Sequence, residues 1–252
     1  MDNPFILSLD GPRANITINR PEKRNALDIT DLERLDTLIG ELQGRKDLRV
    51  LVLTAAGDKA FCAGVDLSDV SSFDWRDNPL ERVCDRIADL PLATICALNG
   101  GVFGGGVDLA QACDFRIGVR GMKLFIPPVR IGVHYHLSGM RRSLACFGAN
   151  VTRRLYLGAE MLGDEDLLAL GFLKSLVAAE ELQAATEALA DHLAGLAPLA
   201  YRGMKATLND LLNERADPAT ISERIGACFT SEDMAEGLAA MKEKRPPRFQ
   251  GR

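Results

Sequence analysis

The sequence predicts an α/β protein whose main sheet is largely parallel, and two observations carry this prediction. Short apolar runs alternate with helix-like runs through roughly the first 120 residues, and several of the apolar runs are continuous. Continuous apolar strands are typical of parallel sheets, which are covered by helices on both faces. Beyond about residue 140 the pattern becomes almost wholly helical.

The individual elements follow in order along the chain. FILSL and NITINR, separated by DGPR, predict an N-terminal β-hairpin. Residues 26–44 predict an amphipathic helix, because leucine and isoleucine recur at helical spacing up to Gly44. Residues 50–55, 93–100 and 115–119 predict buried strands, with one helix inside 73–90 and another that begins at the glycines 104–106. A soft boundary near 196–200 divides an α/β core, residues 1–197, from a helical region, residues 198–252.

Composition excludes several classes of protein. The chain has 252 residues and a net charge of −5, so it lacks the basic surface that nucleic acids require. No apolar run approaches the ~20 residues of a membrane helix, and the N-terminus lacks the pattern of a signal peptide. Six cysteines occur without a CxxC pair, which indicates the reduced thiols of a cytoplasmic protein rather than disulfides or a metal site.

Two glycine clusters each follow a predicted buried strand: KAFCAGVDL (59–67) and LNGGVFGGGVDLAQACD (98–114). Glycine at a helix start lets backbone N–H groups approach a ligand. Two N–H groups aimed at one point form an oxyanion hole, worth roughly 10²–10³ in rate per donor. Nucleotide-binding loops are excluded by spacing, since Leu109 stands where GxGxxG needs its last glycine and no GxxxxGK[ST] occurs. The alternative is that these glycines only permit tight turns.

Four segments in order resemble the crotonase, or enoyl-CoA hydratase/isomerase, superfamily: RPEKRNAL (20–27), AFCAGVDL (60–67), NGGVFGGGVDLAQACD (99–114) and SEDMAEGLAAMKEKRPPRFQGR (231–252). The resemblance implies a right-handed spiral of ββα turns and C-terminal helices that build a homotrimer or a dimer of trimers. It also implies an acyl-CoA thioester as substrate, with no cofactor besides the coenzyme A of that substrate and no metal.

The same resemblance implies roles for individual residues. The thioester oxygen would accept hydrogen bonds from the backbone N–H groups of Val65 and Gly105. Coenzyme A would contact the first motif, the AGVDL segment and, across a subunit boundary, the C-terminal helices; the residues concerned are Lys23, Arg24, Ala26, Ala63, Asp66, Leu67, Phe229 and Lys242. For Lys23 and Arg24, a solvated turn is the alternative. Trp75 is expected in a wall near the acyl group.

The chain departs from the family at both catalytic carboxylates. Family hydratases use two glutamates, and Asp108 stands at the first position while Pro128 stands at the second. Aspartate is one methylene shorter than glutamate, and proline has no proton to give. A standard two-glutamate hydratase and a one-glutamate isomerase both lack their usual base here, so non-standard catalytic residues are expected.

The turn GVHYHLSG (132–139) offers replacements. Neutral histidine acts as acid or base near pH 7, and tyrosine can hydrogen-bond a developing charge. The turn partly resembles that of methylmalonyl-CoA decarboxylases, whose active-site tyrosine aligns with Tyr135. We therefore hypothesise that His134, Tyr135 and His136 act together with Asp108, and that Tyr135 faces the substrate. For the two histidines, the alternative is that one is buried and hydrogen-bonded while the other is exposed.

Three functions remain open at this point: hydration or isomerisation of an enoyl-CoA, decarboxylation of a malonyl-type acyl-CoA, and acyl-CoA binding without catalysis. A carboxylate-bearing substrate would need a guanidinium, and Arg130, Arg141 and Arg142 lie near the turn, where the alternative is a solvated helix face. Asp114 is expected to be structural, and His192 is expected at the surface. The acyl group itself is not predicted.

Overall fold

The computed structural model describes residues 3–66 and 76–252. Its main sheet has six strands in the order β1-β2-β3-β5-β7-β10. β1 (Phe5–Asp10) and β2 (Arg13–Ile18) form the predicted antiparallel hairpin. The other strands continue the sheet in parallel: β3 (Val50–Ala55), β5 (Ala93–Leu98), β7 (Phe115–Val119) and β10 (Ser175–Val177). Every residue of β5 is buried, which explains its continuous apolar sequence.

A second sheet of four short strands lies beside the first, in the order β4-β6-β8-β9: β4 (Ala60–Cys62), β6 (Gly101–Phe103), β8 (Lys123–Phe125) and β9 (Met161–Gly163). The chain alternates between the sheets, since β3 leads to β4, β5 to β6 and β7 to β8, and a helix follows each pair. This succession is the predicted α/β spiral of ββα turns.

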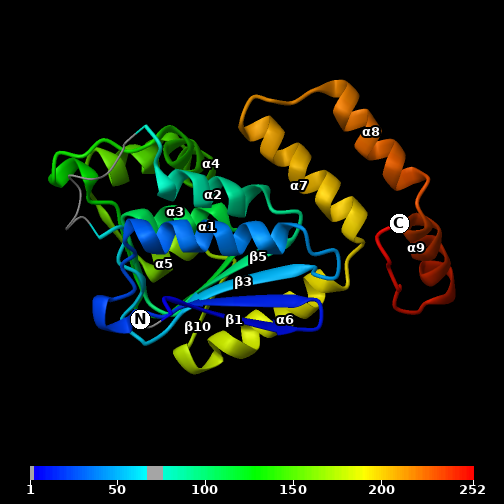
Figure 1. Cartoon of the computed structure of the whole chain (residues 1–252), viewed down its shortest axis with the longest axis horizontal. Coiled ribbons are helices and arrows are strands. Elements are labelled where there is room, and N and C mark those ends of the chain that lie inside the picture. Colours follow the sequence, from blue (N-terminus) through cyan, green and yellow to red (C-terminus); the bar gives the residue numbers. More distant parts are fainter. Residues whose placement is uncertain (1–2, 67–75) are drawn as a thin grey trace.

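The helices cover both faces of the main sheet. Figure 1 shows α1 (Ile29–Gln43), α2 (Pro79–Asp89) and α3 (Gly105–Ala112) on one side of the sheet and α6 (Leu182–Ala194) on the other. α1 begins with a reciprocal capping box between Asp28 and Asp31, and its leucine and isoleucine stripe is buried. The remaining helices are α4 (Leu137–Tyr156), α5 (Asp164–Ala169), α7 (Pro198–Leu212), α8 (Pro218–Phe229) and α9 (Glu232–Glu243).

The prediction that the chain is almost wholly helical beyond residue 140 was wrong in two places. β9 and β10 both lie in this part of the chain, and β10 extends the main sheet beside β7. Each strand has three residues, which is too short to produce an alternating pattern that can be recognised in the sequence.

The C-terminal helices α7, α8 and α9 extend away from the body of the molecule (Figure 1). Lys205 anchors α7, because its buried Nζ lies 2.8 Å from Oδ2 of Asp114 and 2.9 Å from the carbonyl oxygen of Leu92. All six cysteines are free thiols, as predicted. Within residues 3–66 and 76–252, no helix has the length and apolar character needed to cross a membrane.

Candidate active site

The two glycine clusters meet at one point of the fold. Gly64 has a φ of 101°, and a Cβ atom there would lie 3.2 Å from the backbone nitrogen of Gly105. The Leu27 N–H donates to the Gly64 carbonyl and the Asp66 N–H donates to the Leu27 carbonyl, which holds Val65 in an isolated parallel bridge. These bonds use the atoms on either side of the Val65 N–H. Among the described residues, neither the Val65 N–H nor the Gly105 N–H at the start of α3 has a backbone acceptor.

Gly105 has no room for a side chain. A Cβ atom there would lie 2.8 Å from Cδ2 of Leu80 and 3.1 Å from Cγ2 of Val65. Leu80 belongs to the first turn of α2, so the start of α2 packs directly against the start of α3 and the Val65 loop. The glycine is therefore required by close packing, and two backbone donors converge in a partly apolar setting.

The predicted CoA-binding motif RPEKRNAL lies against the same loop. Asn25 anchors it, because its buried side chain donates to the carbonyl oxygens of Ala56 and Ala60 at 2.9 and 2.8 Å. The Ala63 N–H donates to the Arg24 carbonyl at 3.0 Å, and Nζ of Lys23 lies 3.6 Å from Oδ2 of Asp66. The structure therefore brings together five of the predicted CoA contacts: Lys23, Arg24, Ala26, Ala63 and Asp66.

Three further predicted positions lie elsewhere. Leu67 and Trp75 fall outside the described residues. Phe229 and Lys242 lie on α8 and α9, which Figure 1 shows apart from α2, α3 and α4. Within one chain they do not reach the CoA-binding motif, which agrees with the expectation that they would serve a neighbouring subunit.

Asp108 lies in the first turn of α3 and is fully buried. The guanidinium of Arg142, on α4, clamps it from two sides, with Nε 2.7 Å from Oδ1 and Nη2 3.0 Å from Oδ2. Burial raises the pKa of this carboxyl group, but the charge of Arg142 and hydrogen bonds from His136 and Arg142 lower it more, to about 2. Asp108 is consequently a permanent carboxylate at neutral pH, with both oxygens engaged.

Arg142 does not lie on a solvated helix face, which was one of the two interpretations made from the sequence. It is buried, and its Nη1 atom donates to Asp85 at 2.6 Å while the rest of the guanidinium binds Asp108. Two carboxylates thus occupy the group that a substrate carboxylate would need. Arg130 is exposed above the Phe125 ring, and Arg141 donates to Asn213 at 3.4 Å.

His136 caps the N-terminus of α4. Its Nδ1 atom accepts from the backbone N–H of Gly139 at 3.2 Å. Because a peptide N–H can only donate, Nδ1 carries no proton, and the neutral ring has its proton on Nε2. Nε2 lies 3.0 Å from Oδ2 of Asp108, yet the ring N–H is not aligned with any acceptor among the described residues. The contact with Asp108 is therefore mainly electrostatic.

Tyr135 lies between His136 and the oxyanion loop. Its ring stacks on His136 at 4.7 Å between centroids, and its hydroxyl donates to the carbonyl oxygen of Gly104 at 3.4 Å. Burial raises the Tyr135 pKa well above its ordinary value and the negative charge of Asp108 raises it further, so the hydroxyl stays protonated. The Gly104 carbonyl shares a peptide group with the Gly105 N–H, so Tyr135 supports this donor from behind.

His134 points in a different direction from its neighbours. Its side chain is exposed, and Nδ1 lies 2.7 Å from the carbonyl oxygen of Tyr135. Of the two histidines in this turn, one is therefore largely buried and hydrogen-bonded and the other is exposed, which is the alternative that the sequence left open. His192 is exposed on α6, as predicted. Pro128 is buried at the start of a 3₁₀ helix, Pro128–Arg130.

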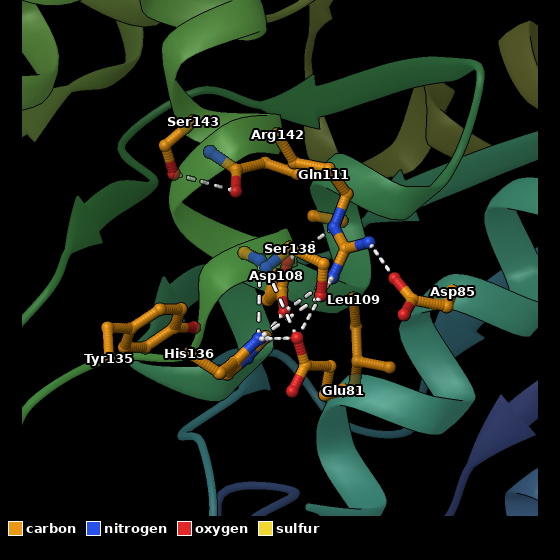
Figure 2. A network of polar contacts seen from close by, with 12 residues as sticks. Glu81, Asp85, Asp108, Leu109, Gln111, Tyr135, His136, Ser138, Arg142 and Ser143 are labelled. Atoms are coloured by element: carbon orange, nitrogen blue, oxygen red, sulfur yellow. Dashed lines mark hydrogen bonds and ion pairs between the residues drawn. The ribbon is translucent and has the colours of Figure 1, made fainter. Parts of the chain in front are cut away.

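Three residues of this cluster were missed in the sequence: Glu81 and Asp85 on α2, and Ser138 on α4. Oε1 of Glu81 accepts from the Ser138 hydroxyl at 2.7 Å and from the Ser138 N–H at 3.2 Å. Figure 2 shows these side chains around His136 and Arg142. The spacing of four residues places Glu81 and Asp85 on one face of a helix, which was a usable signal, but residues 73–90 were interpreted only as a wall of the acyl pocket.

Comparisons with known proteins agree with this geometry. The family model described as enoyl-CoA hydratase/isomerase matches residues 13–252. The short-chain-enoyl-CoA hydratase of Clostridium acetobutylicum is 30% identical over 250 residues, which cover 96% of each chain. The probable enoyl-CoA hydratase echA6 of Mycobacterium leprae is 35% identical over 94% of this chain and 95% of its own. An enoyl-CoA hydratase structure from Bacillus anthracis superposes with a TM-score of 0.91 at 25% identity, over 99% of this chain and 100% of that chain.

These matches span nearly the whole chain, and the fold, the paired glycine loops and the order of the motifs are all present. The chain belongs to the enoyl-CoA hydratase/isomerase family.

Proposed function

We propose that this enzyme adds water across the double bond of a 2-enoyl-CoA thioester. The observation that carries the proposal is the convergence of the Val65 and Gly105 N–H groups, both without a backbone acceptor among the described residues. Relatives that are named as hydratases of enoyl-CoA and crotonyl-CoA support the same reaction class.

The two N–H groups suit the chemistry of a thioester. When a nucleophile adds to the β-carbon, negative charge moves to the thioester oxygen and forms an enolate. Two fixed donors bind this enolate more strongly than the ground-state carbonyl, and each is worth roughly 10²–10³ in rate. Gly104 and Gly105 start α3, so the positive end of the helix dipole adds to the stabilisation.

The charges around the site favour an acyl group without a carboxylate. Glu81, Asp85 and Asp108 are close to one guanidinium, that of Arg142, which is already shared by two of them. A malonyl-type substrate would bring one more carboxylate into a site that is already negative. This arrangement argues against decarboxylation as the main activity.

Coenzyme A would bind along the RPEKRNAL turn and the Ala63–Asp66 loop, with the cation of Lys23 available near phosphates. No cofactor besides the substrate's own coenzyme A enters this proposal. The C-terminal helices expose large apolar side chains, of which Phe229 is 67% exposed and Met241 is 77% exposed. Apolar surface of this kind is typical of an interface, which supports a homotrimer or a dimer of trimers in the cytoplasm.

The first experiment is the intact mass of thioester products after incubation with four substrates: crotonyl-CoA, a 3-enoyl-CoA, methylmalonyl-CoA and an aromatic enoyl-CoA. We expect crotonyl-CoA to gain one water. Loss of CO₂ from methylmalonyl-CoA as the only reaction would overturn the proposal. Binding of every thioester without turnover would do the same and favour a binding-only subunit. Light scattering at micromolar concentration tests the oligomer, which a monomer would contradict.

A matched pair of variants tests the oxyanion hole. Gly105→Ala places a methyl group 2.8 Å from Leu80 and should abolish hydration. Gly44→Ala is the control, because Gly44 ends α1 with a φ of −80° and open space around it. The control should keep the wild-type rate, and circular dichroism will show whether both variants remain folded.

A further inference from the structure

Hydration needs a base that can touch the attacking water, and the expected positions do not provide one. Both oxygens of Asp108 are engaged by Arg142 and His136. Pro128 has no titratable group. Nδ1 of His136 accepts from the peptide of Gly139, while its Nε2 faces Asp108. The base must therefore come from a residue outside the family's two glutamate positions.

Glu81 has the properties that the other groups lack. One oxygen, Oε1, is held by two donors of Ser138, and among the described residues no donor contacts Oε2. The side chain is 31% exposed, so solvent reaches it. Asp108, by contrast, is 0% exposed. Glu81 is thus a carboxylate that is fixed at one oxygen and available at the other.

Glu81 is also in the right place. Its neighbour Leu80 lies against both the Gly105 position and Val65, so the first turn of α2 borders the oxyanion hole. Oε1 lies 3.5 Å from Nδ1 of His136, whose ring is 3.0 Å from Asp108 on its other side. Figure 2 shows Glu81 at the edge of the cluster, with His136 and Ser138 between it and Asp108.

We propose that Glu81 is the catalytic base of the hydration, a role that has moved from α3 and the 127–131 turn to α2. This inference rests on the hydratase activity proposed above. Asp108 then becomes a positioning residue, which together with Arg142 fixes His136 and the N-terminus of α4. Ser138 holds Glu81 in the orientation that exposes Oε2.

The proposed step conserves atoms and charge. Oε2 of Glu81 takes one proton from water while the water oxygen forms a bond to the β-carbon of the enoyl group. The π electrons of the double bond move onto the thioester oxygen as an enolate, which the Val65 and Gly105 N–H groups bind. The enolate then collapses, and the α-carbon takes the proton back from Glu81. The sum is addition of one water and a regenerated carboxylate.

Glu81→Gln tests this role, because glutamine keeps the size of the side chain and the acceptor for Ser138 but cannot take a proton. We expect kcat for crotonyl-CoA hydration to fall roughly 10²–10⁴-fold, the usual contribution of general acid–base catalysis, while KM changes by less than about threefold. Glu33→Gln, at an exposed position on α1, is the matched control and should keep the wild-type kcat.

The outcomes separate the two proposals. If the wild-type enzyme hydrates no enoyl-CoA, the proposed function fails and Glu81 loses its role with it. If the wild type hydrates crotonyl-CoA and Glu81→Gln stays within about fivefold of it, only the assignment of Glu81 is overturned. Glu81→Asp gives a second test should the glutamine variant not fold. Retraction of the carboxylate by one methylene should lower kcat roughly tenfold or more, and an unchanged kcat would contradict the proposal.

Discussion

Two aspartates at the ends of neighbouring ββα turns are both held in ion pairs, yet their surroundings differ. Asp114 accepts from the Thr94 N–H, the Tyr201 hydroxyl and Nζ of Lys205, at 2.9, 3.0 and 2.8 Å, and this network ends there. Asp108 is bound by Arg142, and its network continues through His136 to Glu81, a carboxylate with one available oxygen. The Asp114 network joins α7 to the main sheet, as expected for a structural residue. The Asp108 network opens at the oxyanion loops.

The difference teaches that a buried ion pair does not by itself mark a catalytic residue. Such pairs also arise wherever two elements must be fixed together, and they contribute little net stability compared with apolar packing. What distinguishes the Asp108 network is its open end. The predictions below alter either network in order to separate a structural effect from a catalytic one.

The largest expected effect is the loss of stability on replacing Arg142 with leucine. This change leaves Asp108 fully buried without its partner, which typically costs about 3–5 kcal/mol in the free energy of unfolding. Denaturant unfolding measures it, with Arg141→Leu as the control, since Arg141 makes one long hydrogen bond and should cost less than about 1 kcal/mol. Equal losses in the two variants would show that the Asp108 pair is not the anchor of α4.

Acid should weaken the same anchor. The pKa of Asp108 is about 2 in the folded protein and its ordinary value is 3.8, so the folded state favours the carboxylate. This contribution is fully present above pH 3.8 and is lost as the pH falls through about 2, a total of about 2 kcal/mol. The free energy of unfolding of the wild type should fall by about that much more than that of Asp108→Asn between about pH 5 and pH 2. A carboxyl NMR signal of Asp108 that titrates near pH 4 would contradict this.

The fold was predictable because its long elements carry clear patterns. The hairpin, α1, β3 and β7 all follow from apolar spacing, and the two glycine clusters lie where the sequence places them, after buried strands. The four strands of the second sheet were not predicted, since three residues show no period. Residues that lie far apart in the sequence, as Glu81 and Ser138 do, are brought together only by the packing of α2 against α4.

The site was predictable where it consists of backbone and not where it consists of side-chain pairs. Spacing and the family resemblance identify the loops of Val65 and Gly105. Neither could show that Arg142 occupies Asp108, because a buried arginine and a solvated one look alike in a helical sequence. The partner of a charged residue is set by tertiary contacts, and this is why Asp108 was predicted to be catalytic while Glu81 was overlooked.

Breaking the Asp114 network should cost less and leave catalysis intact. Lys205→Met removes one charged donor, but Asp114 keeps the Thr94 and Tyr201 donors and is partly exposed. We expect a loss of about 1.5 kcal/mol in the free energy of unfolding and an unchanged kcat for crotonyl-CoA. Thermal unfolding and steady-state kinetics on the same sample measure both. A fall in kcat greater than about fivefold would place this network in the catalytic machinery as well.

The smallest expected effect belongs to Tyr135. Its hydroxyl supports the peptide that carries the Gly105 N–H, but at 3.4 Å the hydrogen bond is long. Tyr135→Phe should therefore lower kcat only about 2–5-fold, which corresponds to about 0.5–1 kcal/mol, with KM nearly unchanged. Because phenylalanine keeps the stacking on His136, stability should change little, and this separates the hydroxyl from the ring. A fall of 10²-fold or more would mean that Tyr135 touches the reacting atoms, as the hypothesis from the sequence has it, and would place the open end of the Asp108 network at the tyrosine rather than at Glu81.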